Sequence, residues 1–147
     1  MNASPTPALA SATTLRFAGY AAIFGRRDSG GDTILPGAFA RTLAAHAAEH
    51  ASIPVYWQHR PEQQVGWVDQ VSEDRRGLRV IAHFTNPDGT PAALVRDGAV
   101  RGLSFGYRVK AAVQSPTGRD ILDVDLVEVS LVTRPMQAFA QVHLVTA

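Results

Sequence analysis

Hydrophobic and polar residues alternate along much of this chain, as is typical of half-buried β-strands. The alternation is cleanest over residues 102–109. One face of that segment carries Leu103, Phe105, Tyr107 and Val109, and the other carries Gly102, Ser104, Gly106 and Arg108. The pattern predicts a strand whose apolar face packs into a core. Its other face holds a single hydroxyl, that of Ser104, with a glycine two residues away on each side.

The same reasoning predicts six further strands. They span residues 15–24, 53–57, 65–71, 78–84, 121–133 and 141–145. The polar segment 73–77 is a turn, so the strands on either side of it form a hairpin. Pro61 is expected to end regular pairing after the strand at 53–57. Residues 114–119 are expected to form a loop.

Two helices are expected between the strands. An alanine-rich stretch with one apolar stripe predicts the first over residues 38–50. The second covers residues 92–97, with Thr90 as its cap, Pro91 at its first position and Gly98 as its stop. Because strands outnumber helices, the chain is expected to be mainly β with flanking helices (α+β), arranged as an antiparallel barrel or sheet.

Composition narrows the class of protein. The chain has 147 residues, 46% of them hydrophobic, which suits one domain over residues 15–147. The formal net charge is +1, and this balance favours neither nucleic acid nor an anionic membrane as a partner. There is no cysteine and no apolar run near the ~20 residues of a membrane helix. Residues 1–14 are expected to form a flexible tail, which lacks the features of a secretory signal.

Ser104 is the first candidate for chemistry. Residues 102–106 match the G-x-S-x-G pattern of a nucleophile elbow, in which the serine sits on a turn between a strand and a helix. Here the strand continues past Ser104, so the elbow does not apply. Two interpretations remain, a serine on an exposed strand face and a nucleophile carried by a strand.

A base and an orienting group can be proposed for such a serine. His59 lies where an apolar strand breaks, and a neutral imidazole can take a proton from a serine and return it to a leaving group. Glu128 lies in a strand whose polar side changes partway, so either a bulge re-aims the strand or Glu128 points into partly buried space. A carboxylate there could orient His59. A loop histidine and an exposed glutamate are the alternatives.

A competing motif lies in the first predicted helix. His46, Glu49 and His50 fit the H-x-x-E-H pattern of inverted zinc peptidases, whose two histidines are one helical turn apart. The helix is expected to end just after His50, and no later helix offers a clear third ligand. A solvated helix end is therefore favoured, and no metal or cofactor is expected. A zinc-dependent hydrolase remains an alternative.

Several short motifs follow one another in a characteristic order between residues 15 and 145. They are Gly-Tyr-Ala at 19–21, Pro-Gly-Ala-Phe at 36–39, Val-x-Trp-x-His at 55–59, Gly-Leu-Ser-x-Gly-Tyr at 102–107 and Glu-Val-Ser-Leu-Val-Thr-x-Pro at 128–135. The ordered set resembles the caudovirus prohead maturation proteases of the HK97 type, a family related in fold to the herpesvirus assemblins. The resemblance implies an antiparallel β-barrel of the herpesvirus-protease type with flanking helices.

The resemblance also implies a serine endopeptidase that acts inside the assembling prohead of a tailed phage, a prophage or a gene transfer agent, in the host cytoplasm. Its substrates would be the scaffold, the N-terminal segment of the major capsid protein and the protease itself. Herpesvirus relatives suggest a homodimer by analogy. A non-catalytic capsid-assembly or scaffold-like module with the same fold is the alternative.

Site residues carry over by position. The family's nucleophile falls on Ser104 and its histidine on His59, and the matching acidic segment offers Glu128 as the third member. Alternatives for that third member are Asp123, Asp125 and His143. The family's oxyanion site falls near residues 133–135, where Arg134 or its backbone N–H is the candidate.

Overall fold

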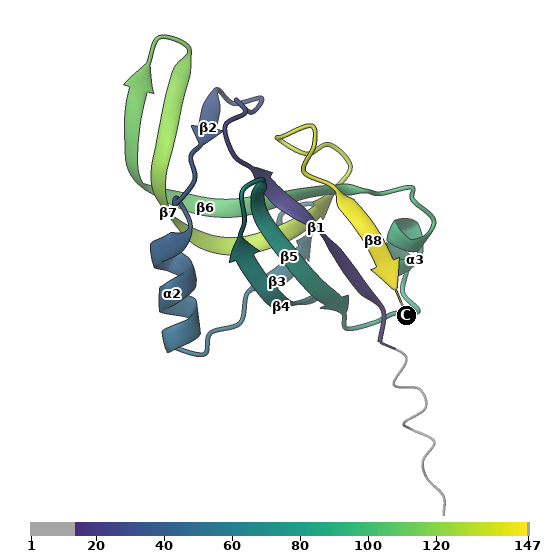
Figure 1. The fold of residues 1–147 in the computed structure, drawn as a ribbon. Helices are drawn as coiled ribbons and strands as arrows, with labels where there is room; N and C mark the ends of the chain where they lie inside the picture. Colours follow the sequence, from purple (N-terminus) through teal and green to yellow (C-terminus); the bar gives the residue numbers. More distant parts are fainter. Residues whose placement is uncertain (1–13, 147) are drawn as a thin grey trace, which may run out of the picture.

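The structure, a computed structural model, describes residues 14–146. These residues form eight strands and two helices (Figure 1). In chain order the elements are β1 (Arg16–Ile23), β2 (Asp32–Ile34), α2 (Ala40–Ala48), β3 (Pro54–Trp57), β4 (Arg60–Glu73), β5 (Gly77–Phe84), α3 (Thr90–Arg96), β6 (Gly102–Ser115), β7 (Gly118–Val132) and β8 (Val142–Thr146). The prediction of a mainly β fold with flanking helices is confirmed. The predicted tail lies outside the described residues except for Thr14.

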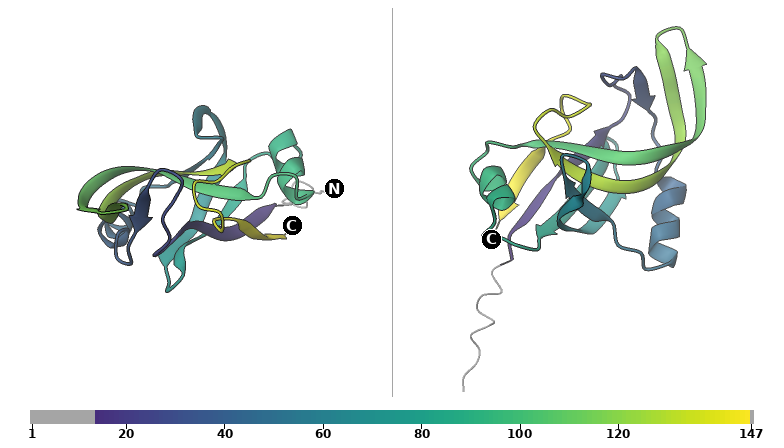
Figure 2. Two further views of the ribbon diagram at one scale, coloured as in Figure 1. Left: turned by 90° about the horizontal axis from the view of Figure 1, so that it is seen from above. Right: turned by 180° about the vertical axis from the view of Figure 1, so that it is seen from behind.

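The strands belong to one sheet with both antiparallel and parallel pairings. Its order is β2-β7-β3-β4-β5-β1-β8, and β6 pairs with β7 off this path. Strand β7 runs parallel to β2 and β3, and the other strand pairings are antiparallel. The ladder does not close, and a closed barrel is not confirmed. An isolated bridge between Gly102 and Gln141 brings the start of β6 beside the start of β8 (Figure 2).

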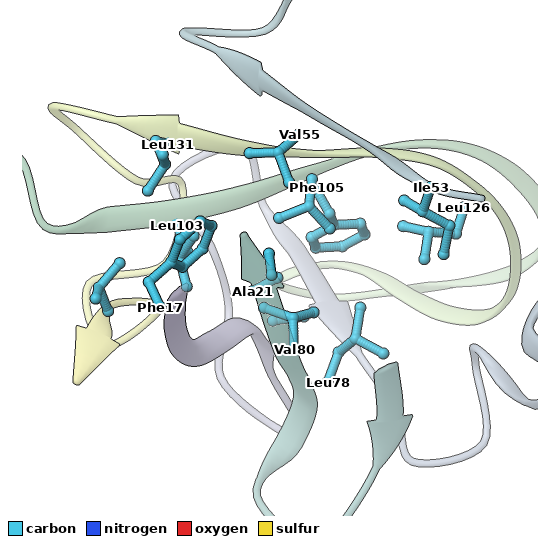
Figure 3. Packing of buried hydrophobic residues seen from close by; sticks show 14 of the residues in the cluster. Phe17, Ala21, Ile53, Val55, Leu78, Val80, Leu103, Phe105, Leu126 and Leu131 are labelled. Atoms are coloured by element: carbon cyan, nitrogen blue, oxygen red, sulfur yellow. The ribbon is translucent and has the colours of Figure 1, made fainter. Parts of the chain in front are cut away.

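The core lies where the curved sheet folds over itself. Side chains from β3, β6 and β7 meet side chains from β1 and β5 in one buried cluster (Figure 3). Leu103 and Phe105, from the apolar face of β6, are both in this cluster. The rings of Phe105 and Phe39 meet edge to face with centroids 5.2 Å apart. The alternation along residues 102–109 thus places one face of β6 in the core and leaves Ser104 on the other.

A β-bulge in β7 explains why the polar side of that strand changes partway. Gly106 pairs with Glu128 and the next residue, Tyr107, pairs with Leu126, so Val127 is an extra residue without a partner in β6. In a regular strand Leu126 and Glu128 would share a face. The extra residue between them places them on opposite faces. Both interpretations left open by the sequence therefore apply, because the strand is re-aimed and Glu128 is buried.

Strands β6 and β7 are longer than predicted. They continue to a tight turn, which replaces much of the loop expected at 114–119 and includes Ser115 Oγ donating to the carbonyl of Gly118. The resulting hairpin extends beyond the body of the molecule in Figure 1 and in the right-hand view of Figure 2. Polar residues and alanines along it gave little period-2 signal, which is why its length was missed.

Three further boundaries differ from the prediction. Strand β4 begins at Arg60 and includes Pro61, but residues 61–63 bulge away from β3, so the missing N–H of Pro61 interrupts no ladder. Helix α3 begins at Thr90, and its N-cap is Gly89 without a side-chain cap. Helix α2 ends at Ala48, two residues before the predicted end. No helix within residues 14–146 is long and apolar enough to span a bilayer.

Candidate active site

Three neighbouring strands position the candidate residues. Strand β7 lies between β6 and β3, so it separates Ser104 on β6 from His59, which follows the end of β3. Ser104 pairs directly with Ser130, and Gly106 pairs directly with Glu128. Residues opposite each other in a ladder share a face. Ser104, Ser130 and Glu128 therefore lie together on the face of β6 and β7 that points away from Leu103 and Phe105.

A strained turn carries His59 onto this face. Trp57 pairs with Arg60, so Gln58 and His59 form a two-residue hairpin loop, with φ values of 54° and 61°. Positive φ at both central residues is typical of a type I′ turn, which costs about 1 kcal/mol or more for each non-glycine residue. Two hydrogen bonds to β7 hold the turn: Gln58 N–H donates to the Leu131 carbonyl at 2.9 Å, and His59 N–H donates to Ser130 Oγ at 3.1 Å.

Glu128 joins the imidazole to Ser130. Its Oε2 lies 2.7 Å from His59 Nδ1, and its Oε1 accepts the Ser130 hydroxyl at 2.7 Å. Glu128 is only 6% exposed, so these two partners replace the water it loses on folding. The hydrogen bond to Glu128 raises the pKa of His59, against the opposing effect of burial. Because a carboxylate only accepts, Nδ1 carries the proton in the neutral ring and leaves Nε2 as the basic nitrogen.

The two glycines beside Ser104 make room for other protein groups. A Cβ at Gly106 would lie 2.5 Å from Glu128 Oε2, so this glycine lets the carboxylate cross over β6. A Cβ at Gly102 would lie 2.6 Å from the carbonyl oxygen of Val132 and 2.8 Å from Pro135 Cδ. Both glycines therefore make room for neighbouring protein groups and leave no open space beside Ser104. Ser104 itself is 4% exposed.

The Ser104 hydroxyl has no hydrogen-bond partner among residues 14–146 in this structure, and no bond joins it to His59 Nε2. Both residues flank Ser130, because the His59 N–H donates to the Ser130 hydroxyl and Ser104 pairs with Ser130 in the ladder. Paired strands are about 4.8 Å apart, so the backbones of β6 and β3, on either side of β7, are about 9–10 Å apart, and the side chains of Ser104 and His59 extend across that gap. Hydrogen bonds between catalytic groups are often long without substrate and tighten when it binds.

The alternatives for the third member lie elsewhere. Asp123 and Asp125 both accept hydrogen bonds from Arg41, at 2.9 and 2.7 Å. His143 is exposed on β8, with its ring 5.9 Å from that of Tyr20. Only Glu128 among these candidates contacts His59. The oxyanion candidate, Arg134, is exposed in the segment that follows β7.

The H-x-x-E-H motif at residues 46–50 does not have the geometry of a zinc site. Glu49 is the C-cap of α2, and His50 has a φ of 51°, so the two histidines do not share a helical face. His46 Nε2 instead lies 3.1 Å from the Leu126 carbonyl. Residues 14–146 contain no group of three or more His, Cys, Asp or Glu residues that could hold a metal ion.

Sequence reasoning missed two residues that build the site. Ser130 bridges Glu128 and the His59 backbone, and the Gln58 Oε1 accepts the Thr133 N–H at 3.3 Å. A signal for Ser130 was present, since it is two residues after Glu128 and so shares its face. Nothing in the sequence pointed to Gln58, whose role depends on a turn that non-glycine residues seldom form.

Solved structures with a similar fold include three viral proteases. The bacteriophage T4 capsid assembly protease superposes with a TM-score of 0.67 over 81% of this chain and 81% of that one, at 12% identity. The KSHV protease, in complex with a hexapeptide phosphonate inhibitor, gives a TM-score of 0.60 over 91% of this chain and 65% of that one, at 13% identity. The varicella-zoster virus protease gives 0.54, at 18% identity over 88% and 63% of the two chains. At such low identity these matches establish the fold, which resembles that of the herpesvirus proteases.

Sequence comparison identifies closer relatives. The prohead protease of Enterobacteria phage HK97 is 36% identical over 126 residues, covering 81% of this chain and 55% of that protein. The capsid polyprotein of Pseudomonas phage PAJU2 is 30% identical over 102 residues, covering 61% of this chain and 15% of that protein. The chain thus spans about half or less of the length of these relatives. The family model for the caudovirus prohead serine protease matches residues 4–147, and the chain therefore belongs to that family.

Proposed function

We propose that this chain is a serine endopeptidase that cleaves capsid-assembly proteins during prohead maturation. Ser104 is the nucleophile, His59 the general base and Glu128 the group that orients His59. The observation that carries the proposal is the 2.7 Å contact between His59 Nδ1 and the buried Glu128, on the sheet face that also holds Ser104. An imidazole oriented by a carboxylate beside a serine is the arrangement that activates a hydroxyl for acyl transfer.

The proposed reaction has two steps. His59 Nε2 takes the proton of Ser104 Oγ as that oxygen attacks a peptide carbonyl, and the resulting imidazolium gives the proton to the leaving amine. An acyl-enzyme ester on Ser104 results. Water, deprotonated by His59, then hydrolyses this ester and frees Ser104. Glu128 keeps its contact with Nδ1 and stabilises the imidazolium.

Arg134 is the proposed oxyanion donor, through its backbone N–H or its guanidinium. It follows β7 directly, and its backbone N–H has no hydrogen-bond partner within the described residues. The neighbouring Thr133 N–H is held by Gln58, next to His59. A free donor at this point could stabilise the negative charge of the tetrahedral intermediate.

The proposed substrates are the scaffold, the N-terminal segment of the major capsid protein and the protease itself, within a prohead in the host cytoplasm. Support comes from the family and from the relative named as a prohead protease. At the high concentration inside a prohead, weak recognition of a peptide segment is sufficient for cleavage. The homodimer suggested by herpesvirus relatives stays a prediction, to be checked by light scattering.

Co-expression with the capsid protein tests the proposal. The wild-type chain should shorten the capsid protein or its scaffold, as read by intact mass, whereas Ser104→Ala and His59→Ala should leave both at full length. Ser115→Ala, on the same strand but outside the site, is the matched control and should cleave normally. If the wild-type chain also leaves every partner intact, the proposal fails and the non-catalytic module with this fold is favoured.

A further inference from the structure

Two adjoining hollows lie beside β1, β8 and the segment that joins β7 to β8. The first, of about 320 Å³, is lined by Tyr20, Arg76, Phe139, Gln141 and His143. The second, of about 300 Å³, is lined by Ile23, Arg26, Arg27, Gln137, Ala138 and Phe139. Phe139 lines both and is 54% exposed, so the hollows meet at its ring. We call this region the arginine surface and define it by Arg26, Arg27, Arg76, Tyr20 and Phe139.

Aromatic rings orient two of the guanidinium groups. The Arg26 Cζ lies 4.7 Å from the centroid of Phe139, and the Arg76 Cζ lies 5.3 Å from the centroid of Tyr20. The Tyr20 hydroxyl donates to Asp74, which anchors that ring. A guanidinium stacked on a ring loses rotational freedom while its N–H edges stay available.

These guanidinium groups have no anionic partner within residues 14–146. No carboxylate oxygen of the described residues lies within 4 Å of the guanidinium nitrogens of Arg26, Arg27 or Arg76. Arg27 donates to the carbonyl of Thr117, and the carboxylate of Asp74 accepts the backbone N–H of Arg76 at 2.7 Å. Arg41 and Arg119 are paired with aspartates, whereas Arg96 and Arg108 also have no ion pair in the part of the chain that the structure describes. Stacking on an aromatic ring distinguishes Arg26 and Arg76 from the other arginines of the described residues. The arginine surface therefore presents preoriented guanidinium groups that form no ion pair within the described residues, with Asp74 at its edge, bound to the Tyr20 hydroxyl and the Arg76 N–H.

We propose that the arginine surface binds an acidic segment of a polypeptide. Guanidinium edges recognise carboxylates through paired hydrogen bonds, and the two hollows have room for aspartate or glutamate side chains. A single-stranded nucleic acid is disfavoured because its bases bind by stacking on aromatic faces, and guanidinium groups already cover faces of Phe139 and Tyr20.

The place of this surface suggests what the acidic segment belongs to. Gln141, in the first hollow, forms the bridge to Gly102, which is two residues before Ser104. An occupant would therefore lie beside the strand that carries the proposed nucleophile. This step rests on the proposed function: the acidic segment is part of the protein substrate, and its binding raises the local concentration of the scissile bond near Ser104.

Binding can be measured without cleavage by using the Ser104→Ala chain. The probe is a fluorescent peptide of alternating glutamate and alanine, followed by anisotropy at low salt. Charge reversal of Arg26→Glu together with Arg76→Glu should weaken binding by about tenfold or more, since two carboxylate contacts become repulsive. Reversal at two exposed arginines elsewhere, Arg96→Glu with Arg108→Glu, changes the net charge equally and should have little effect.

Three results would overturn the inference. They are no binding by the Ser104→Ala chain at low salt, equal losses in the two double variants, and equal or tighter binding of a single-stranded oligonucleotide. Circular dichroism checks folding, and Arg26→Gln with Arg76→Gln replaces the reversal if it unfolds the chain. The proposed function is tested separately: with Ser104 present, the reversal should slow cleavage of acidic substrates and spare a short neutral peptide. If the acidic peptide binds but Ser104→Ala still cleaves, the surface stands and the nucleophile assignment fails.

Discussion

Two buried carboxylates in this fold have opposite kinds of partner. Asp32 on β2 accepts three hydrogen bonds, from Arg119 Nε at 3.0 Å, Arg119 Nη2 at 2.9 Å and the Tyr107 hydroxyl at 3.0 Å. Glu128 on β7 accepts from the Ser130 hydroxyl and contacts the His59 imidazole. Both carboxylates are nearly inaccessible to water, and neither lacks a partner.

The difference lies in whether the partner can change its charge. A guanidinium is always protonated, so Asp32 is held as an anion, and the hydrogen bonds from Arg119 lower its pKa. An imidazole can lose its proton near neutral pH, so the pair of Glu128 and His59 can move a proton. A permanent ion pair therefore anchors the β6–β7 hairpin to β2, whereas the titratable pair is suited to the proton transfer proposed for it. The comparison predicts that Asp32 affects stability and Glu128 affects cleavage.

Glu128→Gln should give the largest effect. The glutamine cannot stabilise an imidazolium, so kcat should fall by about 10²–10⁴-fold. The pKa of His59 should fall as well, because its raising partner is gone, and the acid limb of the kcat/KM profile should move to lower pH. Cleavage of a capsid-protein peptide across pH measures both, with Glu62→Gln on β4 as the exposed control.

The same variant has a stability signature. His59 has a higher pKa in the folded than in the unfolded chain, so its contribution is complete below about pH 6.5, the unfolded value, and is lost as the pH rises through the folded pKa. Glu128→Gln should remove this slope from the free energy of unfolding. A variant that cleaves at the wild-type rate across the whole pH range would refute the role of Glu128.

Asp32→Asn should destabilise the fold and spare cleavage. Removing one partner of a buried ion pair leaves the other charge uncompensated, at about 3–5 kcal/mol when both groups are buried. The Arg119 side chain is 44% exposed and can be hydrated in the variant, so we expect a smaller loss here. Urea unfolding at neutral pH measures the loss, with Asp120→Asn on β7 as the control.

The pH dependence of the Asp32 pair has the opposite sign to that of His59. The pKa of Asp32 is lowered in the folded chain, so its contribution is present above about pH 4, the unfolded value, and disappears as the pH falls through the folded pKa. Asp32→Asn should therefore flatten the acid side of the stability profile. If it also slows cleavage per folded molecule, the division between the two carboxylates is wrong.

Partners of the two carboxylates that are close in the chain could be predicted from the sequence, and distant partners could not. Glu128 and Ser130 are two residues apart, and their strand forms a hairpin with β6, so alternation alone places them near Ser104. The change of polar side along β7 predicted the bulge or the burial, and both occur. These parts of the site follow from local period and register.

Longer-range partners could not be predicted in this way. His59 reaches Glu128 because β3 runs parallel to β7, and Asp32 meets Arg119 because β2 does the same. Periodicity shows which face of a strand is apolar, but it does not show which strand is its neighbour. The sequence linked His59 to Ser104 through the family resemblance, and it gave no sign of the pair formed by Asp32 and Arg119.

Ser130→Ala tests the residue that connects Glu128 to the turn at Gln58 and His59. Losing one hydrogen bond to Glu128 and one from the His59 backbone should lower kcat by about tenfold. Without the Ser130 hydroxyl the carboxylate is less stabilised and attracts the imidazolium more strongly. The acid limb should then move to higher pH, opposite to the shift expected for Glu128→Gln.

The direction of that shift separates two roles for Ser130. A move to lower pH, as for Glu128→Gln, would mean that Ser130 acts by holding the turn at Gln58 and His59 rather than through the carboxylate. Ser72→Ala on β4 provides a serine control away from the site. Unchanged kcat and pH profile would show that Ser130 is not a positioning residue.

Tyr107→Phe should give the smallest effect and tests how separate the two carboxylates are. It removes one of three hydrogen bonds to Asp32 but keeps the ring, whose centroid is 4.6 Å from that of Phe105. The free energy of unfolding should fall by about 1 kcal/mol, and the pKa of Asp32 should rise, so that acid unfolding begins at a higher pH. Tyr56→Phe on β3 is the matched control. Tyr107 is on the same strand as Ser104. Unchanged cleavage would show that the ion pair of Asp32 and Arg119 and the candidate active site work independently. Slower cleavage by fully folded protein would show that β6 couples them.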